Sequence, residues 1–291
     1  MPVSGPDAFS GVRTGETTEE FYMEKLFRQS RRAMVIAPLS GVVLGLAAGA
    51  YLYYVKGMPQ VRALLAVPVI LAVSLLIGKY VSRLVATREY QLLMSLLYAD
   101  LQPEKFIEAV EPLANAKTDP VTKTTTMAHL ANGYAAAGRF EEAHRILEHT
   151  ELPDEAVALR GLLLNNLISC LLLEGKQQKA RSTQTALRNL LLDERCSRDF
   201  KEKVQRSLAY QDICLNIYKA RPADIAALEC DFDSSRNELH KLEVKLYLAI
   251  AYRQKGDQER FHEAQDYVIQ KSGDALYYGK AARALSAEAT P

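Results

Sequence analysis

The sequence predicts an all-α protein in which a two-helix transmembrane hairpin precedes an array of about five helix pairs. Two apolar segments lie close together near the N-terminus, at residues 33–55 and 61–85. From residue 89 onward, apolar residues recur at helical spacing without a convincing strand alternation. Glycine and proline fall mostly between these patterns, where they end helices. Together these observations indicate helices throughout the chain.

The N-terminal tail precedes the first apolar segment. Residues 1–16 are rich in proline, glycine and serine and show no periodicity, which predicts a disordered tail. From Thr17 the pattern becomes helical, and Thr17 can cap this helix together with Glu20 three residues later. We therefore expect residues 17–88 to hold a juxtamembrane helix followed by the hairpin.

The hairpin prediction rests on length and charge. The segment 33–55 has 23 uncharged residues, and at ~1.5 Å per residue its helix crosses a ~30 Å hydrocarbon layer. The second segment, 61–85, has an uncharged core of 16 residues, and Arg62 and Lys79 at the ends of that core can extend towards the interface. Gly57 and Pro59 lie in the loop between the two segments, where they favour a turn.

Flanking cations predict the orientation. Four of them, Lys25, Arg28, Arg31 and Arg32, precede the first segment, and Arg83 and Arg88 follow the core of the second. The positive-inside rule then favours a two-pass integral protein of the cell (inner) membrane with both termini cytoplasmic. If the second segment does not span, the C-terminal part lies on the opposite side. Neither apolar core carries Asp, Glu or His, so a proton or ion path is not expected.

Three glycines in the first segment recur every four residues, at Gly41, Gly45 and Gly49. This spacing places small residues on one helix face, where a second helix can approach closely. That helix is either the second segment of the same hairpin or another membrane subunit, including a second copy of this chain.

The strongest internal pattern lies in residues 125–157. Its characteristic positions are Leu130, Ala131, Tyr134, Gly138, Phe140, Ala143 and Leu147. Weaker matches cover about residues 161–191, where Gly175 takes the place of Gly138, and residues 246–264, with Leu248, Ala249, Tyr252 and Gly256. Small residues let two helices cross closely, and the glycine ends the first helix of each pair.

These positions closely resemble the tetratricopeptide repeat pattern. The resemblance covers residues 89–291 and implies a tetratricopeptide-like α-solenoid whose concave groove takes a peptide or protein segment. An irregular helical bundle with coincidental spacing is the alternative.

The resemblance also implies candidate partner-binding residues on the first helices of the pairs. They are Asn132, Asn165, Asn166, Lys203 and Arg206. An Asn–Asn–Lys–Arg lining resembles the carboxylate clamp of chaperone-binding members, where cations meet a terminal carboxylate. The alternative is that these are solvated residues of helix faces.

The sequence offers little support for chemistry. His144 and His149 are five residues apart and so do not share a helix face, and no usual nucleotide, acyl-transfer or zinc-protease motif occurs. We expect no enzyme activity, no metal and no cofactor. Residues 1–86 carry a net charge of +4 (nine basic, five acidic) and residues 87–291 a net charge of −3 (27 basic, 30 acidic), which argues against nucleic-acid binding.

Two functions remain at this stage. The first is a membrane-anchored scaffold or adaptor that binds a protein or peptide partner in the repeat groove at the cytoplasmic face. The alternative is a structural or assembly subunit of a larger membrane protein complex, held through the hairpin.

Overall fold

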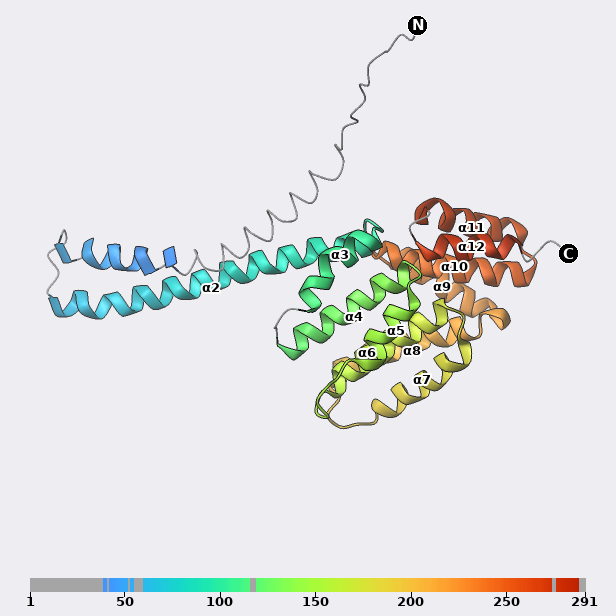
Figure 1. Ribbon diagram of the computed structural model, residues 1–291, viewed down its shortest axis with the longest axis horizontal. Helices are drawn as coiled ribbons and strands as arrows, with labels where there is room; N and C mark the ends of the chain where they lie inside the picture. The colour runs from blue at the N-terminus through green and yellow to red at the C-terminus, as the bar shows by residue number, and fades with distance from the viewer. Residues whose placement is uncertain are drawn as a thin grey trace, which may run out of the picture. The chain divides into compact units, whose positions relative to one another are not determined.

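The computed structural model describes residues 39–40, 42–51, 53–54, 60–115, 119–273 and 276–287 (Figure 1). These residues are predominantly helical and contain no strand, so the all-α prediction is confirmed. The helices with defined bounds are α2 (Gln60–Tyr98), α3 (Pro103–Ala114), α4 (Pro120–Ala136), α5 (Phe140–His149), α6 (Val157–Leu173), α7 (Gln177–Leu190), α8 (Arg198–Leu215), η1 (Ile217–Lys219), α9 (Pro222–Ser234), α10 (Glu238–Lys255), α11 (Gln258–Ser272) and α12 (Tyr277–Ala287).

The chain divides into two compact units, Met1–Leu92 and Leu93–Pro291, and we call them the N-terminal and C-terminal units. The sequence-based boundary was at residues 88/89. Within the N-terminal unit, residues 42–51 and the part of α2 up to Leu92 are helical. The predicted tail 1–16 and the juxtamembrane helix from residue 17 lie outside the described residues.

The predicted membrane spans are only partly covered by the structure. Residues 33–38, 41, 52 and 55 of the first segment, and many side chains of the second, lie outside what is described. Among the helices for which the structure gives a full description, none combines the length and the apolar character that a membrane crossing requires.

Three helices of the C-terminal unit end in the same way. Each is followed by a glycine with positive φ: Gly138 after α4 (79°), Gly175 after α6 (83°) and Gly256 after α10 (75°). The amide of the residue after each glycine donates to a carbonyl in the last turn, as when Lys176 donates to Leu171 at 2.8 Å. This is the glycine C-cap, and the next helix starts one residue further on. The predicted helix end at Gly138 is confirmed.

Each of these helices packs on the helix that follows it. The pairs α4–α5, α6–α7 and α10–α11 are in contact, and α4 also packs on α6, which packs on α8. Small residues lie fully buried at the crossings, namely Ala131 on α4, Ala143 on α5 and Ala180 on α7. The pair α4–α5 in turn packs on the pair α6–α7, and small residues at a crossing allow such close packing.

Two further glycines let an aromatic ring reach a helix backbone. A Cβ added at Gly133 of α4 would lie 2.7 Å from a ring carbon of Phe106 on α3, and one at Gly161 of α6 would lie 2.7 Å from Phe200 on α8. Phe106 is fully buried in this contact. These glycines therefore fix how α3 and α8 pack against the stacked pairs.

The run Glu229–Asp233 lies inside α9, although its acidic and aromatic character alone predicts a loop. Phe232 explains the difference, because its ring packs edge-on against Tyr267 at 5.3 Å and under the ammonium of Lys245 at 4.5 Å. Tertiary contacts thus outweigh the local preference for a loop.

The last helix of the C-terminal unit returns to its beginning. Helix α12 packs on α10 and α11 and also contacts α4. Tyr277 of α12 lies edge-on to Phe140 of α5, with ring centroids 4.8 Å apart. Helices from both ends of this unit therefore surround the same interior space, and this space forms the candidate site.

Candidate functional site

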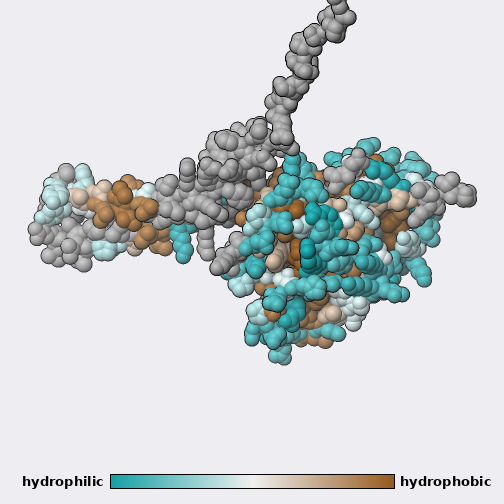
Figure 2. All heavy atoms as spheres, in the orientation of Figure 1, coloured by the Kyte–Doolittle hydropathy of each residue, from teal (hydrophilic) through white to brown (hydrophobic). Residues whose placement is uncertain are grey.

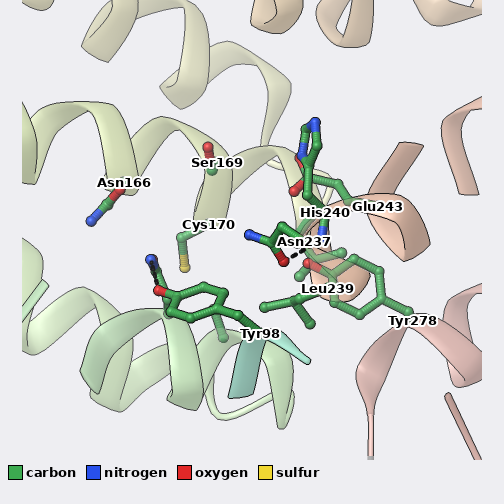
Figure 3. Close-up of a pocket in the computed structure, with 12 residues that line it drawn as sticks. Tyr98, Asn166, Ser169, Cys170, Asn237, Leu239, His240, Glu243 and Tyr278 are labelled. Atoms are coloured by element: carbon green, nitrogen blue, oxygen red, sulfur yellow. Dashed lines mark hydrogen bonds between the residues drawn. The ribbon is translucent and has the colours of Figure 1, made fainter. Parts of the chain in front are cut away.

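The C-terminal unit encloses a small polar pocket of about 180 Å³ (Figure 3). It is lined by Tyr98 from the end of α2, Asn132 and Ala135 from α4, Asn166, Ser169, Cys170 and Leu173 from α6, Asn237, Leu239, His240 and Glu243 from α10 and its N-cap, and Tyr278 from α12. Pockets for small molecules usually measure ~300–1,000 Å³. This one fits a single side chain or chain end better than a whole metabolite.

Helical spacing places the polar groups. Asn237 caps α10 by accepting a hydrogen bond from the His240 amide at 3.1 Å. From this start, His240 and Glu243 are three residues apart and share the face of α10 that lines the pocket. In Figure 3, Asn166 and Cys170 of α6 lie across the pocket from His240, Glu243 and Tyr278.

A chain of hydrogen bonds orders the side formed by Tyr98. The Asn132 amide donates to the Tyr98 hydroxyl oxygen at 3.1 Å, and that hydroxyl lies 2.7 Å from His129 Nδ1. Because Tyr98 accepts from Asn132, its own proton is available to His129, whose Nδ1 then acts as acceptor. Burial lowers the pKa of His129, which favours the neutral ring that this arrangement requires.

The opposite side of the pocket is acidic. Burial raises the pKa of the Glu243 carboxyl, while nearby His240 and Tyr210 act in the opposite direction. His240 Nε2 lies 2.8 Å from Asp231 Oδ2, so any positive charge on His240 is shared with that second carboxylate. This side therefore places the carboxyl groups of Glu243 and Asp231 near a single imidazole, that of His240.

Burial keeps two further groups of the pocket, the Cys170 thiol and the Tyr278 hydroxyl, in their neutral forms. Burial raises the pKa of the Cys170 thiol to about 12 and that of the Tyr278 hydroxyl well above its ordinary value. Among the described residues, no lysine or arginine lines the pocket. The pocket thus combines amide, hydroxyl and thiol groups with a single carboxylate of its own, that of Glu243.

The structure separates the five predicted partner-binding residues. Asn132 and Asn166 line the pocket. Asn165 does not, because its backbone and side-chain oxygens accept from the Gln211 amide of α8 at 3.3 and 3.1 Å. Lys203 and Arg206 lie exposed on α8, outside the pocket lining. The two asparagines and the two cations of the predicted carboxylate clamp are therefore not assembled in this pocket.

The glycine series is described in part. Gly41 lies outside the described residues, whereas Gly45 and Gly49 are buried in the helical residues 42–51. Val43, Leu44 and Leu46 of the same segment are exposed.

Six polar residues of the pocket were not among the predicted partner-binding residues. They are Tyr98, Ser169, Asn237, His240, Glu243 and Tyr278. The three-residue spacing of His240 and Glu243, just after an Asn N-cap, was an available but weak signal. The sequence contained no signal for Tyr98 and Tyr278, because no local sequence pattern indicates that the two ends of the C-terminal unit meet.

The remaining histidine of interest, His144, links neighbouring helix pairs. Its Nε2 lies 2.7 Å from Glu174 after α6, and its Nδ1 lies 3.3 Å from Glu148, which also pairs with Lys179 of α7 at 2.6 Å. Within the described part of the chain, no group of three His, Cys, Asp or Glu side chains is placed to hold a metal ion. His144 is therefore part of a polar network that joins the pairs α4–α5 and α6–α7.

No protein-family model, no curated protein and no solved structure matches this chain. Its function must therefore be inferred from the pocket and from the contrast between the two units.

Proposed function

We propose that this protein is a membrane-anchored adaptor, without enzymatic activity, whose C-terminal unit captures part of a protein partner in the pocket. The pocket carries this proposal. It is lined by the first helix of each of the pairs α4–α5, α6–α7 and α10–α11, and it presents amide and hydroxyl groups suited to a chain end or a side-chain end.

Within this proposal, the pairs α4–α5, α6–α7 and α10–α11 act as tetratricopeptide-like repeats of an α-solenoid. Their shared glycine C-caps, with the second helix starting two residues after the glycine, support this interpretation. So do the buried alanines at the crossings. The contact of α12 with α4 narrows the concave side of such an array to a pocket.

The anchor in this proposal is a two-pass hairpin at residues 33–55 and 61–85, with both termini cytoplasmic. The uncharged run of 23 residues and the cations before it support this part. The described residues of the N-terminal unit add a second argument, because many large apolar side chains are exposed there (Figure 2). Tethering to a membrane raises the local concentration of a partner, so weak pocket contacts can suffice.

The test of partner capture compares matched asparagine variants of the full chain. Asn132→Ala combined with Asn166→Ala alters the pocket, whereas Asn189→Ala changes an exposed amide on α7. After cross-linking in cells and purification in mild detergent, proteins recovered with wild type and with the Asn189 variant should be lost from the double variant. If the double variant retains the same proteins, the pocket is not where partners bind.

The test of anchoring uses sealed vesicles. We expect the C-terminal unit to be cleaved by protease added to inside-out vesicles and protected in right-side-out vesicles. Extraction of the protein by carbonate would contradict an integral anchor, and the reverse protease pattern would contradict the orientation.

A further inference from the structure

We propose that the pocket of the C-terminal unit binds a primary ammonium group of the partner, from a lysine side chain or a free amino end, rather than a terminal carboxylate. This inference rests on the proposed function, since it names the group that the adaptor captures. It departs from the clamp implied by the sequence, which would bind an anion.

The charges that line the pocket carry the argument. Glu243 contributes a carboxylate, and Asp231 holds a second one behind His240, 2.8 Å from its ring nitrogen. The cations of the predicted clamp, Lys203 and Arg206, lie on α8 outside the lining. An incoming carboxylate would meet Glu243 as a like charge in a partly desolvated space, whereas an ammonium supplies the opposite charge.

The neutral groups also suit an ammonium. Such a group has three N–H donors and no acceptor, so it needs oxygen atoms from several directions. Ser169 donates back to the Asn165 carbonyl at 3.5 Å, which leaves its oxygen lone pairs available as acceptors. In Figure 3 the Glu243 carboxylate is directed towards the space between α10 and α6, the helix that carries Ser169. The rings of Tyr98 and Tyr278 border the same space and can add cation–π attraction.

The size of the pocket agrees with a small head group. At about 180 Å³ it is well below the usual range for small-molecule sites, and its lining mixes polar groups with Ala135, Leu173 and Leu239. The apolar members suit the methylene groups that precede a lysine ammonium, or the first side chain after an amino end. The pocket therefore fits the end of a chain and not an extended peptide along its length.

Four synthetic tripeptides test the inference on the full chain in detergent. Three consist of alanine only: the first is capped at both ends, the second has a free amino end and the third has a free carboxyl end. The fourth is capped at both ends and has lysine in place of the central alanine. Calorimetric titration should show at least about tenfold tighter binding for one or both ammonium peptides than for the fully capped peptide. The carboxyl peptide should bind no better than the capped one. Comparing the lysine peptide with the free-amino peptide shows whether the pocket prefers a lysine side chain or a free amino end.

Glu243→Gln should abolish this preference, because glutamine keeps the shape and removes the charge. Glu259→Gln, an exposed position on α11, makes the same chemical change outside the pocket and should leave the preference intact. The inference is overturned by tightest binding of the carboxyl peptide, by equal or undetectable binding of all four, or by a folded Glu243 variant that retains the preference. The peptide series on the wild-type chain decides the question if that variant does not fold.

Failure here is distinguishable from failure of the adaptor proposal. If the asparagine double variant loses its cross-linked proteins while no ammonium preference exists, the pocket captures partners through another group. If the ammonium peptides bind but no protein is lost from the double variant, the pocket recognises the cation without serving as the partner site in cells.

Discussion

The two units of this chain treat large apolar side chains in opposite ways. Leu76 in the N-terminal unit is 67% exposed, whereas Leu97 in the C-terminal unit is fully buried, although both belong to α2. Figure 2 shows the same contrast, with hydrophobic residues on the surface of the N-terminal unit and a mainly hydrophilic surface on the C-terminal unit. The helical pattern shows which side chains need an apolar environment, but not what provides it. In the C-terminal unit other helices do so, and we propose that lipid does so in the N-terminal unit.

The largest expected effect comes from truncating these two leucines. Leu97→Ala removes a fully buried side chain and should cost about 2–5 kcal/mol of unfolding free energy. Leu76→Ala should change it by less than about 0.5 kcal/mol, because its side chain is mostly exposed. Denaturation of the full chain in mild detergent, followed by circular dichroism, measures both. Equal losses would contradict the contrast between the units.

Glycine also serves different purposes in the two units. Gly45 and Gly49 are buried inside a helix, whereas Gly175 lies at a helix end with φ of 83° and open space around it. Gly175→Ala should therefore cost about 1–2 kcal/mol through backbone strain alone. The control Gln178→Ala, at an exposed position of α7, should stay within about 0.5 kcal/mol of wild type in the same denaturation experiment. Indistinguishable stabilities would show that the left-handed cap is not required.

The burial of Glu243 in the pocket makes the unfolding free energy of the C-terminal unit depend on pH. Burial raises the pKa of Glu243, so the folded state binds this proton more tightly than the unfolded state. The resulting stability is complete below the unfolded pKa of ~4.3 and is lost as the pH rises through the folded pKa. A glutamine at position 243 cannot ionise, so the Glu243→Gln variant keeps this stability as the pH rises.

Glu243→Gln should accordingly melt higher than wild type at a pH of about 8, by about 2–4 °C, and the gap should shrink towards a pH of about 5. Melting curves of both proteins across this range measure the gap. Glu259→Gln provides the control, since its carboxyl is exposed and the gap should be absent. A gap that widens towards low pH would contradict the assignment.

The smallest effect concerns thiol reactivity within the C-terminal unit. Cys230 is exposed, whereas Cys170, Cys196 and Cys214 are buried. Burial raises the pKa of Cys170 to about 12 and that of Cys214 well above its ordinary value, which further lowers their reactivity. Iodoacetamide should modify Cys230 quickly in the folded chain and the other three only after denaturation, with no fast phase in Cys230→Ser. Rapid modification of Cys170 in the folded chain would show that the pocket opens widely.

The sequence by itself determined the features that depend on neighbouring residues. Helical periodicity predicted an all-helical chain, Gly138 marked a helix end, and the pattern around Tyr134 and Ala143 located a helix pair. Each of these follows from the preferences of a few adjacent residues, because capping and amphipathic spacing act over one or two turns.

Only the tertiary structure decided which groups meet. The run Glu229–Asp233 is helical because Phe232 packs against Tyr267, and Tyr98 and Tyr278 share one pocket because α12 returns to α4. The sign of the pocket's charge was decided in the same way, since Glu243 faces inward while Lys203 and Arg206 remain exposed on α8. Contacts between residues far apart in the chain depend on how whole helices pack, and no local rule specifies that packing.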